Sequence, residues 1–466
     1  MISSVGLEHY LDRVGVTGSN PVSPTMIRIT KYFIFFFLLT TQFILSQEYN
    51  FDKLHDYFDV LEENNKFMGS VAISKGDSLI FTRSVGYLDF EINKKINSRS
   101  KFRIGSISKT FTSVLILKAE EDGKLNLDDT IESYFPDIPN SNKITVENLL
   151  SHRSGIFNFT DSSDYTDYML EPKSRAELID IISNFDSSFK PGRRSSYSNS
   201  NYVLLTIILE KIYSKDYSEI LLDNIIKPLR LDSTYYGGVI DVNDNEARSY
   251  MYAGKWIKQD ETDPSIPLGA GGIVSNPIDL VKFSYLLFNG KILKEESLKK
   301  MKKINGQFAF GLFDIPFYNK NGFGHTGGID GFSSVFSAFI DDDIYYALNS
   351  NGTNFNNNDI SIAVLSDVFD KPYEIPVFSN FAVNHKDLMK LIGSYSSKQI
   401  PLIIQVSVEN NVLIVQATGQ PKISLDAIEK NLFKSEVVGA ELEFVPDENT
   451  FILKQNGAKI KFEKSN

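Results

Sequence analysis

Ser106 and Lys109 stand three residues apart in the stretch Ser106-Ile107-Ser108-Lys109. A serine hydroxyl is a weak nucleophile at neutral pH and needs a base close to it. Residues three apart on a helix share a face, so the Lys109 amine can reach the Ser106 hydroxyl. A lysine serves as a base only where burial or neighbouring cations lower its pKa. The pair therefore predicts catalysis through a covalent acyl-serine, with Ser106 as nucleophile and Lys109 as its activating base.

The Ser-x-x-Lys spacing is weakly informative alone, because the chain contains it three more times, at Ser98/Lys101, Ser187/Lys190 and Ser297/Lys300. The surroundings distinguish Ser106. Gly105 allows a tight turn into the motif, and the apolar residues Phe111, Val114 and Leu115 follow at helical spacing. A buried helix there would supply the low-polarity environment that the lysine needs. A serine at a helix N-terminus also places its Oγ and its N–H where an anion is favoured.

Tyr197-Ser198-Asn199 is a second candidate, in the stretch PGRRSSYSNSNYVLL. Tyrosine and asparagine two residues apart on a short loop can point into the same cleft. Tyr197 could hold or relay the Ser106 proton together with Lys109, and Asn199 could bind a substrate amide. Without the other motifs, an ordinary surface loop explains this segment equally well.

His325-Thr326-Gly327-Gly328 is the third candidate, and strand-like runs rich in glycine flank it. Small residues on an edge strand let a substrate lie against the backbone. The backbone N–H groups of Ser106 and Gly328 could together form an oxyanion hole. An ordinary hydrogen-bonded histidine is the alternative interpretation of His325.

The elements that must position these residues are predicted as strands, then many helices, then strands again. A helix is expected over 51–66, with strands at 69–74 and 78–84 around a turn. Further helices are expected after Ser106, at 146–150, at 200–212 and at 277–288, and strands dominate residues 308–348. This order predicts an α+β domain over residues 50–370, with one antiparallel sheet and a helical region.

The sequence changes character after that domain. Two prolines and no clear period predict a linker at 371–384. Beyond it, short apolar runs flank the turn sequences Asn410-Asn411, Asp447-Glu448-Asn449 and Asn456-Gly457. Residues 385–466 are therefore expected to form a small all-β domain without a catalytic cluster.

Composition excludes several other functions. The chain has no cysteine, so a thiol nucleophile, a disulfide framework and a cysteine-ligated metal are excluded. Its five histidines are scattered without metal-binding spacing, and no metal or other cofactor is expected. The net charge of −11 argues against nucleic-acid binding, which needs clustered Lys and Arg. The expected partner is a small-molecule or peptide substrate, and the oligomeric state is left open.

The N-terminal part of the chain predicts export. Residues 26–46 combine two basic residues, an apolar stretch and a small residue at the end, which is typical of a secretory signal peptide. The apolar stretch is shorter than the ~20 residues that a bilayer span needs. The mature protein is thus expected to be periplasmic or secreted, without a stable membrane span. Residues 1–25 do not fit in front of a signal peptide, and we expect translation to start at Met26.

Together the three motifs make the chain resemble the β-lactamase-related serine hydrolases. This group includes class C β-lactamases, penicillin-binding DD-carboxypeptidases, D-aminopeptidases and esterases. The blocks that carry the resemblance lie between residues 51 and 370 and read FRIGSISKTFT, LLSHRSGI, PGRRSSYSNSNYVLL, GAGGIVSNPIDL and GHTGGIDGF. The resemblance implies a β-lactamase/DD-peptidase-like fold and an enzyme that acts through an acyl-enzyme.

The same resemblance implies a role for each motif residue. Ser106 becomes the nucleophile, Lys109 its base partner and Tyr197 the proton shuttle to the leaving group. The substrate-binding residues become Asn199 for an amide, His325 with Thr326 on the carboxylate side, and Gly328 in the oxyanion hole. His152, in the block LLSHRSGI, becomes a structural residue rather than a base.

One departure from the family pattern concerns His325. β-Lactamases and many penicillin-binding proteins carry lysine at this place, and a neutral histidine binds a carboxylate less well. The substrate is therefore left open among D-amino-acid peptides, β-lactams and carboxyl esters. The alternative function is a catalytically slow penicillin-binding or sensor-type protein that binds cell-wall fragments or a partner.

Overall fold

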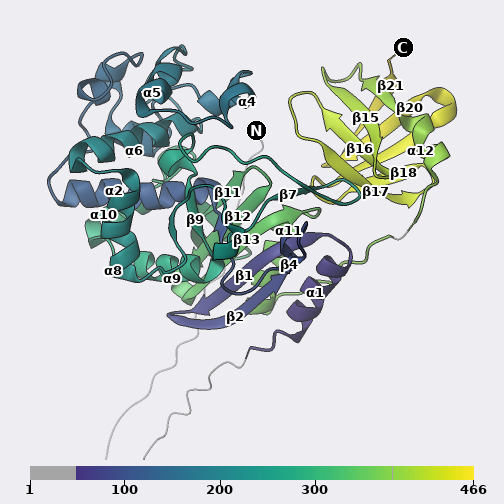
Figure 1. The fold of residues 1–466 in the computed structure, drawn as a ribbon, viewed down its shortest axis with the longest axis horizontal. Coiled ribbons are helices and arrows are strands. Elements are labelled where there is room, and N and C mark those ends of the chain that lie inside the picture. Colours follow the sequence, from purple (N-terminus) through teal and green to yellow (C-terminus); the bar gives the residue numbers. More distant parts are fainter. Residues whose placement is uncertain (1–48, 380, 466) are drawn as a thin grey trace, which may run out of the picture. The chain divides into compact units, whose positions relative to one another are not determined.

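The computed structural model of the protein describes residues 49–379 and 381–465 (Figure 1). The upstream segment 1–25 and the signal peptide expected at 26–46 lie outside these residues. Within the described part of the chain, each helix is too short or too polar to cross a bilayer.

A six-stranded antiparallel sheet is the centre of the predicted catalytic region (residues 50–370), with the strand order β10-β11-β12-β13-β1-β2. The turn between β1 and β2 contains Gly76 in the left-handed region (φ 60°), which confirms the predicted hairpin. The strands of this sheet are β1 (Phe67–Lys75), β2 (Ser78–Val85), β10 (Phe313–Phe317), β11 (Lys320–Ile329), β12 (Phe332–Phe339) and β13 (Ile344–Thr353).

Both faces of this sheet are buried, because alternate side chains of its strands enter two different cores. Ala72 and Ala347 point into the larger core, which they share with the helical region. Val71 and Leu348, the neighbouring residues on the same strands, point into the second core. Two helices complete that second core, namely α1 (Asp52–Glu63) and α11 (Asn357–Val368). The expected first helix is confirmed, although it ends at Glu63 because β1 begins at Phe67.

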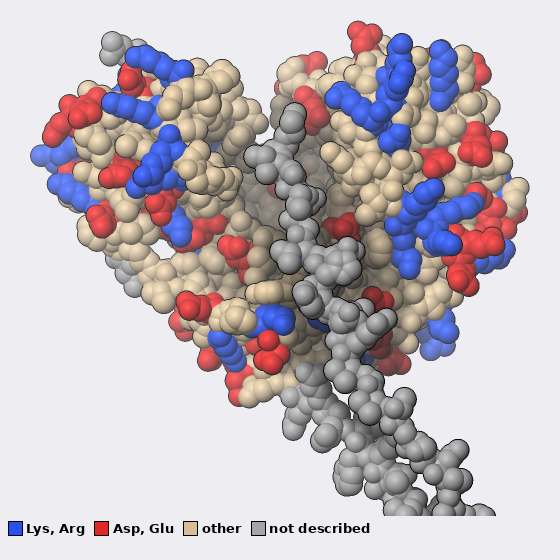
Figure 2. Space-filling view, turned by 180° about the vertical axis from the view of Figure 1, so that it is seen from behind, with Lys and Arg blue, Asp and Glu red and all other residues tan. Residues whose placement is uncertain are grey.

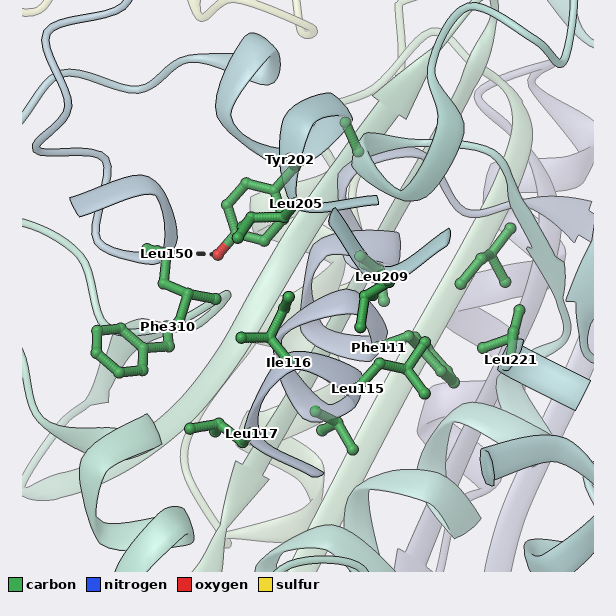
Figure 3. Packing of buried hydrophobic residues seen from close by; sticks show 14 of the residues in the cluster. Phe111, Leu115, Ile116, Leu117, Leu150, Tyr202, Leu205, Leu209, Leu221 and Phe310 are labelled. Atoms are coloured by element: carbon green, nitrogen blue, oxygen red, sulfur yellow. Dashed lines mark hydrogen bonds between the residues drawn. The ribbon is translucent and has the colours of Figure 1, made fainter. Parts of the chain in front are cut away.

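The helical region packs around two long helices, α2 (Ser108–Glu121) and α6 (Asn199–Tyr213). Figure 3 shows Phe111, Leu115 and Ile116 of α2 facing Leu205 and Leu209 of α6 in the larger core. The Tyr202 hydroxyl donates a hydrogen bond of 2.9 Å to the Leu150 carbonyl and so ties α6 to α3 (Val146–Leu150) (Figure 3). Burying apolar side chains on both helices fixes the segments that carry the first two motifs.

The remaining helices of the catalytic region include one that was predicted. Helix α9 (Pro277–Phe288) has the expected bounds, and the Asn276 side chain caps it by accepting the Asp279 N–H at 2.8 Å. The basic residues at 299–303 lie largely on α10 (Glu295–Lys302). The other helices are α4 (Tyr165–Tyr168), α5 (Arg175–Ser183), α7 (Tyr217–Leu221) and α8 (Lys227–Leu229).

Small sheets hold the loops around the candidate site. β5 (Phe102–Arg103) and β6 (Tyr235–Tyr236) both pair with β9 (Ile273–Ser275). The other two pairs join β3 (Tyr87–Asp89) to β4 (Lys94–Lys95) and β7 (Tyr250–Tyr252) to β8 (Trp256–Lys258). The catalytic region is thus an α+β fold, as predicted.

The C-terminal region is a closed all-β barrel of eight strands. The strands are β14 (Gly393–Ser396), β15 (Ile403–Glu409), β16 (Val412–Ala417), β17 (Ile423–Glu429), β18 (Leu432–Ser435), β19 (Ala440–Val445), β20 (Thr450–Gln455) and β21 (Ala458–Lys464). The predicted turns are present, since Asn410 and Asn411 both have positive φ, as a type I′ turn requires. Two features were not foreseen, namely the closure of β14 on β21 and the helix α12 (His385–Leu391).

Side chains of both charge signs lie close together on the face drawn in Figure 2. Blue Lys and Arg residues alternate there with red Asp and Glu residues, and neither sign forms a continuous band. Phosphate-binding surfaces concentrate one sign, so this face does not have their pattern.

Candidate active site

Ser106 lies in a 3₁₀ turn, η1 (Gly105–Ile107), directly ahead of α2. Gly105 has φ 51°, a conformation that glycine adopts without strain. A Cβ atom at Gly105 would lie 2.7 Å from the backbone nitrogen of Gly328. The turn therefore needs glycine for its conformation and for its close approach to the third motif. Lys109 lies in the first turn of α2, three residues after Ser106, so the two side chains share a face.

The Lys109 amine contacts the nucleophile and two acceptors. Its Nζ lies 3.0 Å from Ser106 Oγ, 2.7 Å from Asn199 Oδ1 and 2.6 Å from the Ala270 carbonyl oxygen. The side chain is fully buried, and this burial lowers the pKa of Lys109 well below its ordinary value. A neutral amine has two N–H bonds and one lone pair. Two of its three neighbours here are pure acceptors, so the lone pair is left for the Ser106 hydroxyl.

Tyr197 lies on the loop before α6, next to the nucleophile. Burial raises the pKa of Tyr197, and its contact with the Ser106 hydroxyl offsets this only in part. The Lys109 Nζ lies 5.0 Å from the centre of the Tyr197 ring. Tyr197 is thus a protonated phenol beside a serine and an amine of lowered pKa, which is an arrangement through which a proton can pass.

Asn199 is the first residue of α6, and its side chain is held on both sides. Its Oδ1 accepts from Lys109, and its Nδ2 donates to Thr160 Oγ1 at 3.0 Å. Its backbone N–H donates to Asn158 Oδ1 at 2.8 Å. Asn199 also lines the cavity beside Ser106, and it binds the Lys109 amine, a contact that sequence reasoning did not predict.

His325 lies on β11 and is almost completely buried. Burial and the neighbouring Lys109 lower the pKa of His325 to about 3, so its imidazole is neutral at pH 7. Its Nδ1 lies 2.5 Å from the Thr326 carbonyl oxygen, and its ring packs 4.4 Å from that of Phe313. Thr326 itself is exposed on the strand. The His325 ring does not line the cavity beside Ser106, whereas Gly328 does.

The backbones of the first and third motifs approach each other closely. A Cβ atom on Gly327 would collide with the Ile104 carbonyl oxygen. The Ser334 hydroxyl of β12 donates to that same carbonyl at 2.8 Å. The glycines after His325 thus allow the Ser106 turn to lie directly against β11, as the oxyanion-hole prediction requires.

His152 lies behind Tyr197, in the left-handed region with φ 54°. Its Nδ1 accepts the Ser198 N–H at 3.1 Å, which places the imidazole proton on Nε2. Burial, Lys109 and His325 all lower the pKa of His152, so this ring is neutral too. Its contacts fit the structural role expected from the sequence.

A cavity of about 360 Å³ opens beside Ser106. Its lining residues combine apolar side chains with side chains that carry hydroxyl and amide groups. The lining residues are Ser106, Phe159, Thr160, Tyr165, Met169, Asn199, Thr262, Pro267, Ala270, Gly271, Gly328, Ile329 and Asp330. Within the described part of the chain, no group of three or more acidic or histidine side chains could hold a metal ion.

The family model described as Beta-lactamase matches residues 59–367 of this chain. The chain belongs to the Beta-lactamase family. This match confirms the resemblance drawn from the ordered motifs, all of which lie within the matched residues.

The relatives of this chain include both a penicillin-binding protein and a hydrolase. The chain is 26% identical to penicillin-binding protein 4* of Bacillus subtilis (strain 168), over 87% of this chain and 97% of that protein. It is 28% identical to the teichoic acid D-alanine hydrolase of Staphylococcus aureus (strain NCTC 8325 / PS 47), over 71% of this chain and 82% of that protein. Because such relatives are hydrolases, they support the interpretation of this chain as a hydrolase.

Two solved structures of Beta-lactamase-family proteins show the same fold. The D-amino acid amidase of Ochrobactrum anthropi SV3, complexed with D-phenylalanine, has a TM-score of 0.61 and 26% identity. That match covers 68% of this chain and 99% of the amidase. The octameric penicillin-binding protein homologue of Pyrococcus abyssi has a TM-score of 0.62 and 24% identity, over 88% of this chain and 99% of that one.

Sequence reasoning missed several residues of this Beta-lactamase-family site. The apolar wall formed by Phe159, Tyr165 and Met169 comes from loops without a periodic pattern, so no local signal predicted it. The GAGG turn was noticed as a block, and the structure shows that its Ala270 carbonyl binds the lysine. Arg103 and Asp330 carried no signal apart from their positions beside the first and third motifs.

Proposed function

We propose that this protein is a serine hydrolase that forms an acyl-enzyme at Ser106 and acts on small D-amino-acid amides or esters. One observation carries the proposal. The buried Lys109 amine lies 3.0 Å from the Ser106 hydroxyl, in an environment that lowers its pKa and so favours the neutral, basic form. A neutral amine at hydrogen-bond distance is the base that a serine nucleophile needs.

Acylation begins with the Ser106 proton. Lys109 Nζ takes this proton while Ser106 Oγ attacks the substrate carbonyl carbon, whose π electrons move to its oxygen. The N–H groups of Ser106 and Gly328 stabilise the resulting oxyanion. The oxyanion collapses and breaks the bond to the leaving nitrogen or oxygen, which takes a proton from the Tyr197 hydroxyl. Tyr197 regains its proton from the Lys109 ammonium, so the proton balance closes.

Deacylation reverses these roles with water as nucleophile. The water gives its proton to Tyr197 Oη, which passes its own proton to the neutral Lys109 amine, as the water oxygen attacks the acyl-serine carbonyl. The ester bond to Ser106 then breaks, and Ser106 Oγ recovers the proton. Asn199 holds the lysine through both steps and presents its amide group to the substrate.

The charge of the site favours a substrate without a carboxylate beside the scissile bond. None of the described residues that line the cavity is Lys or Arg. The His325 ring is neutral, and burial lowers the pKa of Lys109 and so disfavours its positive charge, which weakens the attraction of both for an anion. β-Lactams and C-terminal D-peptides carry such a carboxylate, whereas D-amino-acid amides and D-alanyl esters do not. The names of the S. aureus and O. anthropi relatives support the D-amino-acid class.

Intact-mass measurement after treatment with a fluorophosphonate tests the mechanism. The wild-type protein should gain one adduct, and the Ser106→Ala variant should gain none. An adduct that persists in the variant would refute the role of Ser106.

Substrate preference is tested with a D-alanine amide, a D-alanyl ester and a D-alanyl-D-alanine peptide, using the L-isomers as controls. We expect kcat/KM to be at least about tenfold lower for the carboxylate-bearing peptide, which corresponds to roughly 1.4 kcal/mol of transition-state binding. A preference for that peptide contradicts the substrate assignment. Labelling without turnover on the whole set favours the alternative, a slow penicillin-binding or sensor-type protein.

We also propose that residues 26–46 export the protein and that translation starts at Met26. The domain boundaries proposed with them are 50–370 for the catalytic domain, 371–384 for the linker and 385–466 for the β domain. N-terminal sequencing of the precursor tests the start site, and N-terminal sequencing of the mature protein tests the removal of residues 26–46. A peptide from residues 1–25 in either species would contradict it.

A further inference from the structure

We propose that the buried Arg103–Asp330 ion pair positions the two backbone segments that form the oxyanion hole. The pair acts through those segments and does not touch the substrate, so both are positioning residues. This inference rests on the proposed function, because it assigns the pair a purpose in acyl transfer.

The pair is enclosed and its hydrogen-bonding groups are satisfied. The Asp330 side chain has no exposed surface, and that of Arg103 is 7% exposed. Arg103 Nη1 donates to Asp330 Oδ2 at 3.2 Å and to the Thr262 carbonyl at 2.7 Å, and Nη2 donates to the Gly238 carbonyl at 3.1 Å. Asp330 Oδ1 accepts from the Thr262 N–H at 3.0 Å and from the Thr262 hydroxyl at 2.6 Å.

These contacts leave Asp330 without a free oxygen for a ligand. Asp330 borders the cavity, and a carboxylate there would otherwise be read as a site for a substrate ammonium group. Both of its oxygens are already engaged by buried donors. The geometry therefore favours a role in holding the chain over a role in binding.

The pair joins the two segments that carry the oxyanion-hole N–H groups. Arg103 ends β5, three residues before Ser106, and Asp330 directly follows the end of β11, two residues after Gly328. Asp330 itself has φ 53°, so the chain turns sharply at this point. The distance between the two donors depends on how these two segments are held together.

Backbone hydrogen bonds between strands do not join these two segments. β5 pairs with β9, and the neighbours of β11 are β10 and β12. In the described part of the chain, no backbone hydrogen bond joins residues 104–106 to residues 327–330. Apart from the close packing of the glycine backbones, side-chain hydrogen bonds supply the link. They are the Ser334 bond to the Ile104 carbonyl and the Arg103–Asp330 pair.

Two variants separate this role from simple loss of stability. Asp330→Asn keeps an acceptor for Thr262 but removes the charge that holds Arg103. The double variant Arg103→Met with Asp330→Asn removes the whole pair. A single substitution would leave one buried charge without its partner, which is strongly destabilising, and the double variant avoids this. The matched control is Arg175→Met, which breaks the two-pronged Arg175–Glu210 pair on residues that do not line the cavity.

Kinetics on a chromogenic D-alanyl ester provide the first measurement. We expect kcat to fall about 10- to 100-fold in both Asp330 variants, somewhat less than the loss of a whole oxyanion donor, while KM changes less than about threefold. Arg175→Met should change neither constant. A rise in KM at constant kcat would overturn the inference, because it would mean that the pair shapes only the Thr262 wall of the cavity. An equal loss of kcat in Arg175→Met would also overturn it.

Hydrogen exchange provides a second measurement that needs no turnover. Peptides that contain Ser106 and Gly328 should exchange faster in Asp330→Asn than in the wild type, and at the wild-type rate in Arg175→Met. Unchanged exchange in Asp330→Asn refutes the positioning role even if the enzyme is active. An inactive wild-type protein refutes the proposed function, and the exchange data then still decide whether the pair holds the two segments.

Discussion

The imidazole of His152 lies 4.5 Å, centroid to centroid, from the ring of Tyr197, while its Nδ1 accepts the N–H of the next residue, Ser198. One side chain thereby fixes both the ring and the backbone of the segment that carries the phenol. His152 lies in a different motif from Tyr197, and its φ of 54° points the ring toward that segment.

Replacing His152 should therefore impair proton transfer by Tyr197. We expect His152→Ala to lower kcat by about tenfold or more, a loss of roughly 1.4 kcal/mol, with little change in KM. His152→Asn, which can still accept the Ser198 N–H, should recover part of that loss. Steady-state kinetics measure both, and His385→Asn on the exposed helix α12 is the control. Equal losses in the Ala and Asn variants would argue against the backbone contact.

Lys109 should be required for acylation. Lys109→Met keeps much of the side-chain volume but removes the base, so the rate of Ser106 labelling should fall by about 10²- to 10⁴-fold. Stopped-flow measurement of labelling checks this. Lys118→Met, on the same helix but partly exposed, should label at the wild-type rate. Wild-type labelling in Lys109→Met would instead identify Tyr197 as the first base.

Gly105 should tolerate no side chain. Its φ is 51°, and a Cβ atom would meet the Gly328 backbone at 2.7 Å. Gly105→Ala should lower the free energy of unfolding by about 1–3 kcal/mol and abolish most activity. Gly123→Ala is a matched control, because Gly123 has φ 67° but open space around its Cα. Urea unfolding of both separates backbone strain from the clash, and equal effects would show that the clash is unimportant.

The stability of the protein should fall on acidification through the buried histidines. The folded-state pKa of His325 is lowered to about 3 from an ordinary 6.5, so the unfolded chain binds the extra proton first. Stability is thus complete above pH 6.5 and declines as the pH drops toward 3, by up to about 1.4 kcal/mol per pH unit for this group.

Urea unfolding between pH 4.5 and 7 measures this dependence. His325→Gln removes the titrating group and should flatten the curve by roughly 2–3 kcal/mol over that range. The residual slope should include His152, whose pKa is also lowered by burial. A variant with the same slope as the wild type would show that His325 does not titrate in this way.

Local sequence patterns predicted many helices, strands and turns of this chain, and each such pattern has a physical cause. The apolar residues after Ser106 recur at helical spacing because one face of α2 is buried, and the turn residues Asn410 and Asn411 mark a hairpin because they accept positive φ. The ordered motifs predicted which side chains meet. The structure brings Ser106, Lys109, Tyr197 and Asn199 together and leaves the His325 ring buried behind them.

Contacts between distant segments left no local signal. Arg103 meets Asp330 only because the rest of the fold brings the end of β5 close to the residue that follows β11. Asn199 accepts from Lys109 because α2 and α6 pack together, and spacing could suggest only that it faced a substrate. Closure of the barrel likewise depends on β14 meeting β21, two strands at opposite ends of that region.

The central sheet has a consequence for how the chain folds during synthesis or export. β1 lies between β2 and β13, and its Ile73 pairs with Tyr346. The N-terminal hairpin therefore keeps one open edge until nearly the whole catalytic region has emerged. Such long-range pairing slows folding and prolongs the exposure of apolar strands. The C-terminal barrel is built mainly from successive hairpins, so a holdase that protects β1 should matter more to the yield of this protein than any assistance to its barrel.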